Sequence, residues 1–211
     1  MAITGYPPQD LLYEKGFVKK NKEVLKEIIS NNVDIVGIVG FVDYDDEGNL
    51  YNAAAIFEGD RIVGIRYKAL LPTYDVFDED RYFKPAKEEQ IQPVEVKING
   101  ENVKLGVEIC EDLWDQEYET KVTDLLAEKG ANLIVNISAS PFYAGKRFER
   151  EELLKEKAVK NRISIFYVNL VGGQDELVFD GQSLAVDASG NLIAFAKQFE
   201  EDTCAEYRKQ D

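Results

Sequence analysis

The sequence contains no histidine among its 211 residues. This absence excludes the Ser-His-Asp and Cys-His catalytic arrangements and the histidine zinc sites, and no metal site is expected. Any acid–base or nucleophilic chemistry must therefore use carboxylates, lysine, tyrosine or cysteine. Cysteine is scarce as well: Cys110 and Cys204 are too few for a disulfide framework, which favours a reducing cytoplasmic location.

Long apolar runs and positive charge are also in short supply. No stretch approaches the roughly 20 apolar residues that span a membrane, and the start, MAITGYPPQD, resembles no signal peptide. The 25 Lys and Arg residues face 40 Asp and Glu residues, which gives a formal net charge of −15. That charge repels phosphate backbones and anionic lipids, so we expect neither nucleic acid nor a membrane as a partner.

Apolar residues make up 45% of the chain, enough to bury the core of one domain. Amphipathic helical patterns at 17–31, 118–129 and 146–162 alternate with apolar or alternating strand patterns, and hairpin turns occur at 59–60, 99–100 and 189–191. Residues 71–93 show no period and predict a long ordered loop. Strand–helix alternation mixed with hairpins predicts an α/β layered sandwich with a mixed sheet.

Three segments place reactive groups where predicted strands end. In YKALLPTYDVFDEDRYF, Lys68 closes a strand, although a lone lysine is also compatible with an exposed surface position. In LGVEICEDLWD, Cys110 stands among acids that raise a thiol pKa, so it is either an inert strand-end residue or activated by a group distant in sequence. In NISASPFYAGKRFER a strand breaks into a Ser-Pro turn, which could be only a loop with a helix cap.

Together, YKALLPTYDVFDEDRYF, LGVEICEDLWD, SPFYAGK and VNLVGGQDELVFDGQS follow the order and approximate spacing of the nitrilase, or carbon–nitrogen hydrolase, superfamily. More narrowly, the chain resembles the amino-terminal glutaminase domains of glutamine-dependent NAD synthetases, from GYPPQDLL to AFAKQFEED. The resemblance implies a nitrilase-like α-β-β-α sandwich with mixed sheets, and a single carbon–nitrogen hydrolase domain over residues 1–211.

The resemblance also implies the residues of the site, because the family uses a Glu-Lys-Cys triad. Lys68 matches the lysine and Cys110 the nucleophile. The lysine ammonium would offset the acids around the thiol and later face the oxyanion. The substrate pocket implied by the resemblance consists of Tyr6, Tyr74, Phe77, Glu79, Glu111, Ser140 and Lys146, of which Lys146 would suit the carboxylate of glutamine.

The sequence departs from the family at both ends. Relatives carry the catalytic glutamate after a first strand–helix–strand, just before the segment matching MAITGYPP. We therefore expect the domain to be incomplete at its amino terminus, to lack that base and to be nearly inactive alone. Glu108 shares the strand face of Cys110, but we do not expect it to substitute. No SGG motif of an ATP-dependent synthetase domain occurs, and the ending TCAEYRKQD does not resemble the family's continuation.

The leading hypothesis is a glutamine amidohydrolase in which Cys110 attacks the side-chain amide and releases ammonia. The ammonia would feed an ATP-dependent synthetase domain that amidates deamido-NAD. Glutamine and that synthetase domain are the implied partners, ATP and Mg²⁺ belong to the absent domain, and this domain needs no cofactor. A homo-oligomer is implied by resemblance. The alternatives are a stand-alone amidase of the same superfamily, or an inactive fragment that serves as a structural or interaction module.

Overall fold

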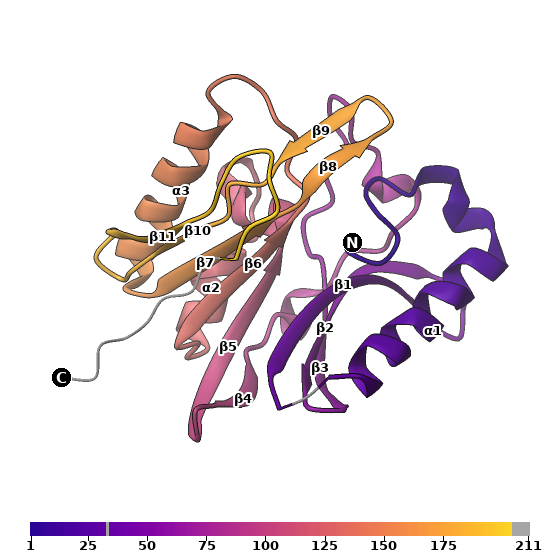
Figure 1. Ribbon diagram of the computed structural model, residues 1–211, viewed down its shortest axis with the longest axis horizontal. Helices are drawn as coiled ribbons and strands as arrows, with labels where there is room; N and C mark the ends of the chain where they lie inside the picture. Colours follow the sequence, from indigo (N-terminus) through magenta and orange to yellow (C-terminus); the bar gives the residue numbers. More distant parts are fainter. Residues whose placement is uncertain (33, 204–211) are drawn as a thin grey trace.

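The computed structural model describes residues 1–32 and 34–203, and it shows two β-sheets packed against each other (Figure 1). The first sheet has the order β1-β2-β3, with β1 at Val36–Tyr44, β2 at Leu50–Glu58 and β3 at Arg61–Tyr67. All of its neighbours are antiparallel. Hairpin connections explain this, because parallel neighbours require a longer crossover.

The second sheet has six strands in the order β11-β10-β7-β6-β5-β4. Its central strands β5, β6 and β7 are parallel, and the outer strands pair antiparallel, so this sheet is mixed as expected. The strands are β4 (Val94–Ile98), β5 (Glu101–Ile109), β6 (Leu133–Ser138), β7 (Ser164–Asn169), β10 (Leu184–Val186) and β11 (Leu192–Phe195).

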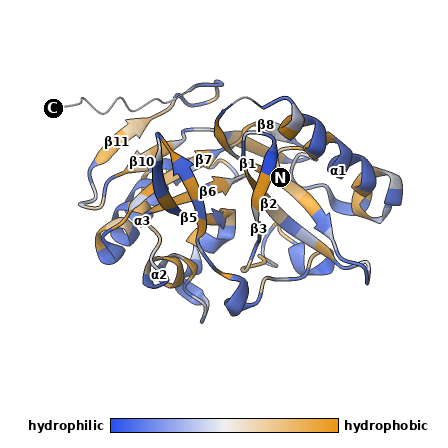
Figure 2. Cartoon of the chain, turned by 90° about the horizontal axis from the view of Figure 1, so that it is seen from below, coloured by the Kyte–Doolittle hydropathy of each residue, from blue (hydrophilic) through white to orange (hydrophobic). Residues whose placement is uncertain are grey.

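The core between the sheets is built from alternate residues of facing strands. Ala54 and Ile56 of β2 pack against Val107 and Ile109 of β5, and all four are buried. Hydrophobic positions concentrate on the strands, while the outward faces of the helices are largely hydrophilic (Figure 2). The period of two in each strand thus produces the contact between the sheets.

Helices cover the outer faces of both sheets. Helix α1 (Lys15–Ser30) buries Leu25 and Ile29 against the three-stranded sheet. Helices α2 (Val122–Glu128) and α3 (Lys146–Asn161) pack on the six-stranded sheet, where they form its outer apolar cluster. The result is the expected α-β-β-α sandwich. No helix within the described residues is both long enough and apolar enough to cross a membrane.

The structure changes several expected boundaries. The strand expected at 163–171 ends at Asn169, and a separate hairpin follows, formed by β8 (Val171–Gln174) and β9 (Leu177–Asp180). The helix expected at 118–129 begins at Val122, because two 3-10 turns, η4 (Cys110–Leu113) and η5 (Asp115–Glu117), use the preceding residues. Cys204, and position 33 of the expected strand 33–44, lie outside the described residues.

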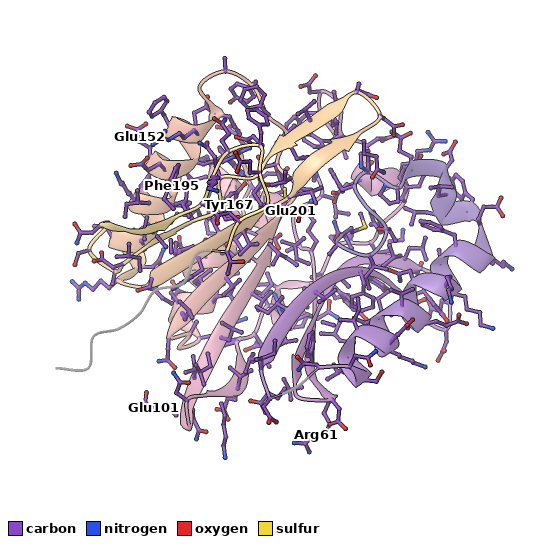
Figure 3. The ribbon with its side chains drawn as sticks, in the orientation of Figure 1. Arg61, Glu101, Glu152, Tyr167, Phe195 and Glu201 are labelled. Atoms are coloured by element: carbon purple, nitrogen blue, oxygen red, sulfur yellow. The ribbon has the colours of Figure 1, made fainter. Side chains whose placement is uncertain are left out.

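The direction of the parallel strands separates the two ends of the sandwich. Arg61 and Glu101 mark hairpin turns at one end (Figure 3). Strands β5 and β6 run toward the other end and finish at Ile109 and Ser138. Reactive side chains that follow these strands therefore meet at one edge, where α/β folds place their ligands.

Candidate active site

Cys110 stands at a sharp turn between β5 and the 3-10 helix η4. Its φ of 48° lies in the left-handed region, which is costly for a residue with a side chain. The turn lets Cys110 pack at the margin of the cluster between the sheets. The surrounding hydrogen bonds must hold this backbone, and they identify residues that the sequence did not single out.

The carboxylate of Asp112 holds the turn through hydrogen bonds to backbone N–H groups. One oxygen accepts a hydrogen bond from the N–H of Ile109 at 3.0 Å. The other accepts from the N–H groups of Ala69 and Leu70 at 3.0 and 2.9 Å. Because Ala69 follows Lys68 directly, Asp112 fixes the lysine-bearing strand end to the cysteine-bearing one.

Lys68 and Glu79 form a buried ion pair. The Lys68 Nζ lies 2.8 and 2.9 Å from the two carboxylate oxygens of Glu79, and the side chains are only 1% and 5% exposed. Burial acts to lower the pKa of Lys68, but the negative charges of Glu79 and Cys110 outweigh it, and the pKa is raised. The lysine therefore remains an ammonium at neutral pH.

The Cys110 thiol experiences opposing effects. Burial raises its pKa, Lys68 and the backbone N–H of Ala139 lower it, and Glu79 and Glu111 raise it further. The net pKa is above that of an ordinary thiol. Cys110 is therefore influenced by a lysine distant in sequence, yet it rests as a thiol and needs a proton acceptor before it can attack.

Glu111, the residue after the nucleophile, is held by two phenols. Its Oε1 accepts hydrogen bonds from the hydroxyls of Tyr74 at 2.8 Å and Tyr118 at 3.0 Å. Burial raises the pKa of Glu111, and the two tyrosine hydrogen bonds oppose that shift. Tyr118 was not expected from the sequence, because its local pattern is that of an aromatic residue at the start of a helix and does not indicate a role in the site.

Three aromatic rings form a wall beside these acids. The ring centroids of Tyr6 and Phe77 are 6.4 Å apart, and those of Phe77 and Tyr74 are 5.6 Å apart. Tyr6 is buried, and its pKa is raised by burial and by the charge of Glu79. Tyr6, Phe77 and Glu79 also line a cavity of about 180 Å³. The expected pocket positions of the amino-terminal segment and the long loop thus lie together.

Ser140 follows β6 and is buried in a network that anchors its turn. Its N–H donates to the Oδ1 of Asn169 at 2.9 Å, and Arg150 donates to its carbonyl at 2.8 Å. Arg150 is itself fully buried and paired with Asp180 at 2.7 Å. The network therefore ties the turn after β6 to helix α3 and strand β9.

Lys146 begins helix α3 and points back toward the turn after Cys110. Its Nζ lies 3.5 Å from the ring centroid of Trp114 and 3.5 Å from a carboxylate oxygen of Glu149. Burial lowers the pKa of Lys146, while Glu149 and, more weakly, Cys110 act against that shift. The three segments with reactive groups therefore converge around Cys110.

A second cavity, of about 360 Å³, opens between the sheets next to this site. Met1, Ala139 and Asn169 are among its lining residues, and Ala139 is the residue whose N–H acts on the Cys110 thiol. The backbone N–H groups of Ala2 and Ile3 donate to the carbonyl of Gly40 on β1 at 2.9 and 3.3 Å. Met1 and Ala2 therefore lie beside β1 on the side that faces the second sheet, whereas Ile3 packs toward α1 (Figure 1).

The expectation that Glu108 shares the strand face of Cys110 is wrong. Its carboxylate accepts a hydrogen bond from Asn136 of β6, on the side of the sheet that faces α2. The reason is the left-handed turn at Cys110, which takes the chain out of the strand alternation. No cluster of three potential metal-ligating side chains occurs in residues 1–32 and 34–203.

Comparisons with known proteins identify the family and the fold of the chain. The carbon-nitrogen hydrolase family profile matches residues 1–206. The chain is 44% identical over 204 residues to the glutamine-dependent NAD(+) synthetase of Thermotoga maritima, covering 96% of this chain and 34% of the relative. For the Aquifex aeolicus synthetase the identity is 43%, with the same coverage. The chain therefore spans about a third of the length of these relatives.

Solved structures give the same result at the level of the fold. The glutamine-dependent NAD+ synthetase of Acinetobacter baumannii matches with a TM-score of 0.83 and 34% identity, over 94% of this chain and 36% of that one. A carbon-nitrogen hydrolase of Helicobacter pylori matches with a TM-score of 0.75 at 24% identity, over 95% of this chain and 70% of that one.

Proposed function

Since this chain belongs to the carbon–nitrogen hydrolase family, we propose that its Cys110 site hydrolyses the side-chain amide of glutamine. The observation that carries the proposal is the buried Lys68–Glu79 ion pair. Its ammonium group lies near the Cys110 thiol and lowers the pKa of that thiol. A fixed positive charge beside a nucleophilic sulfur is what amide attack requires, because negative charge develops on the carbonyl oxygen.

In the proposed reaction the Cys110 sulfur attacks the amide carbon, and the thiol proton passes to a base. The carbonyl oxygen becomes an oxyanion that faces the Lys68 ammonium. The tetrahedral intermediate then breaks its C–N bond, and the nitrogen leaves as ammonia after taking up a proton. Water attacks the resulting thioester, which gives glutamate and restores the thiol.

Free glutamine fits the charges at the rim of the site. Lys146 offers a positive charge for the α-carboxylate, and Glu111 offers a negative one for the α-ammonium group. Tyr6, Tyr74 and Phe77 would enclose the aliphatic part of the side chain. Ser140 completes the pocket on the side of β6, where its backbone is firmly held.

We propose that the proton acceptor is a carboxylate on a segment joined to the amino side of Met1. Glu79 is engaged by Lys68 through both oxygens, and Glu111 by two tyrosines. Burial lowers the pKa of the Met1 amino group to about 6, and the charges of Cys110 and Glu79 act on it. A residue bonded to Met1 would therefore enter the space beside the thiol.

The wider role follows the names of the relatives. We propose that the released ammonia is used by an ATP-dependent synthetase domain to amidate deamido-NAD in the cytoplasm. ATP and Mg²⁺ would serve that step, and the glutaminase domain would need no cofactor. We also propose a homo-oligomer, in keeping with the exposed apolar residues of α3 and β11.

The test compares glutamate release by Cys110→Ala, Lys68→Ala and a surface control, Lys20→Ala. The background is this chain preceded by a strand–helix–strand segment that ends in glutamate. The effects of substitutions within one catalytic unit are not additive, and each single substitution can remove nearly the whole rate enhancement. We therefore expect each site variant to lose nearly all activity and the control to keep it. Substantial glutamine turnover by either site variant would contradict the assignment.

Two comparisons separate the alternatives. Propionamide hydrolysis faster than glutamine hydrolysis would indicate a stand-alone amidase, and no turnover of either amide would indicate a structural module. Residues 1–211 alone should be slower than the extended chain by roughly 10²–10⁴-fold, the usual contribution of a general base. Equal rates would show that a carboxylate within residues 1–211 is the base.

A further inference from the structure

The backbone carbonyl of Cys110 is held from the neighbouring strand by an asparagine side chain. Strands β5 and β6 are parallel, and their register places Asn136 beside Glu108. The Asn136 Nδ2 donates to the Cys110 carbonyl and to the Glu108 Oε2, both at 3.3 Å. Its Oδ1 accepts a hydrogen bond from the Ser138 hydroxyl at 2.6 Å. Both amide hydrogens are therefore used, and the orientation of the amide is fixed by an acceptor on each side of the nitrogen.

Glu108 is an unusual residue for its position. It is 0% exposed and lies on the face of β5 where the neighbouring Gly106 is packed by Ile134 and Leu126. Its Oε1 has no hydrogen-bond partner, and the same is true of the buried Thr123 hydroxyl on α2. Buried polar atoms without partners are costly, so an apolar residue would pack this position more favourably.

Two of the charged groups around Glu108 are engaged by other partners. Lys157 of α3 pairs with Asp115 of η5 at 2.7 Å. Asp112 of η4 accepts hydrogen bonds from three backbone N–H groups, whereas the buried Arg66 of β3 makes no ion pair within the described residues, and its Nε has no hydrogen-bond partner there. Within the described part of the chain, Asn136 makes the hydrogen bond to Glu108, and the Thr123 hydroxyl of α2 is a second polar group that faces its carboxylate.

We propose that Glu108 and Asn136 are positioning residues of the nucleophile. Glu108 orients the Asn136 amide, and the second amide hydrogen holds the Cys110 carbonyl. This contact opposes relaxation of the left-handed backbone at Cys110, which otherwise has Asp112 on only its amino side. The catalytic consequence rests on the function proposed above, whereas the effect on the thiol does not.

The variants separate the hydrogen bond from the charge. Asn136→Leu removes the contact with the Cys110 carbonyl at similar side-chain volume. Glu108→Leu removes the anchor of the amide, and Glu108→Gln keeps an acceptor for Asn136 without a charge. Leu154→Ala is the matched control, because it removes a fully buried side chain from the outer apolar cluster but no hydrogen bond to the turn.

The first measurement is the rate of Cys110 alkylation by iodoacetamide in a Cys204→Ser background, which needs no catalytic activity. We expect Asn136→Leu and Glu108→Leu to slow alkylation roughly tenfold or more, because small displacements of a nucleophile have large effects on rate. Glu108→Gln should alkylate within about twofold of the parent rate, because its side-chain oxygen still accepts the hydrogen bond from the Asn136 amide. Leu154→Ala should alkylate at the parent rate while unfolding at lower urea concentration.

The second measurement is glutaminase kinetics in the extended chain. Asn136→Leu should lower kcat while KM stays near the parent value, since the pocket residues are untouched. Parent-like alkylation and kcat in folded Asn136→Leu would overturn the proposal, as would failure of Glu108→Gln to rescue. If Glu108→Leu does not fold, Asn136→Leu and Glu108→Gln decide. A chain with no glutaminase activity but the expected alkylation pattern would contradict only the proposed function.

Discussion

Lys68 and Glu79 show how single residues set the chemistry of the site. The resemblance implied a pocket role for Glu79, whereas the structure places both of its oxygens on the Lys68 ammonium. A buried lysine without a partner tends to lose its proton, because burial disfavours its charge. Glu79 keeps Lys68 charged, and Lys68 in turn draws the thiol pKa downward against burial and the neighbouring acids.

The burial of Glu108 predicts a pH dependence of the free energy of unfolding, independently of the positioning role proposed for this residue. Burial raises its pKa from 4.5 to about 7, while Thr123 and Lys157 oppose the shift. The folded state therefore holds this proton more tightly than the unfolded state. The stabilising contribution is complete below about pH 4.5 and is lost as the pH rises through about 7.

Glu108→Gln should remove this dependence. The free energy of unfolding of the parent, measured against that of the variant, should fall by on the order of 3 kcal/mol between pH 4.5 and pH 8. Urea unfolding at a series of pH values measures the difference. Glu23→Gln, at an exposed position, should follow the parent at every pH; a constant difference between the parent and Glu108→Gln would contradict the shifted pKa.

The ends of two strands are joined by Asp112. It accepts hydrogen bonds from Ala69 and Leu70 after β3 and from Ile109 at the end of β5. The sequence pointed to Lys68 and Cys110, because each stands in a distinctive motif. It did not point to Asp112 as the link between them, because a side chain that binds backbone groups some forty positions away leaves no local pattern.

Asp112→Ala should weaken both the fold and the site. Each buried N–H that loses its acceptor costs about 1–3 kcal/mol, so a total destabilisation of about 3 kcal/mol or more is expected. Cys110 alkylation should slow as well, since the turn loses its support. Glu23→Ala, which breaks a pair with Lys20 in which both side chains are exposed, should cost less than about 1 kcal/mol. Urea unfolding of the two variants makes the comparison, and equal losses would refute the role of Asp112.

Across the whole molecule, an exposed apolar area extends over α3 and β11. Phe148 is 65% exposed, and Val159, Leu192 and Phe195 are exposed with it. The Arg147 guanidinium lies 5.4 Å from the ring of Phe148 and 4.6 Å from that of Phe195, so these residues are neighbours. Figure 3 places Phe195 beside α3 on the outer side of the sandwich. Exposed apolar area of this kind is typical of an interface.

Sedimentation velocity should therefore detect a species larger than the 23.9 kDa monomer. Phe148→Glu should shift the distribution toward the monomer, because a charge would be buried at the interface. Ile28→Glu changes a residue of α1 that is 39% exposed, far from this area, and should not shift it. A monomeric parent protein, or equal effects of the two substitutions, would contradict the proposed oligomer.

The sequence by itself determined the class of fold, and it predicted Lys68 and Cys110 as the two residues on which the proposed function depends. Strand and helix periods depend on local alternation, and the sandwich follows once each apolar face must be covered. The motifs around Lys68 and Cys110 were distinctive enough to identify the family. The expected hairpins at 59–60, 99–100 and 189–191 also form, because turn residues act locally.

Tertiary structure alone decided which groups neighbouring Cys110 act on it. Glu79 pairs with Lys68, Glu111 is held by Tyr118, and Glu108 turns away to Asn136. The paired residues lie 11, 7 and 28 positions apart, and no local pattern in the sequence indicates which acid pairs with which partner. Burial and the distances between charges set the pKa values of such groups, and both quantities exist only after the sheets have packed.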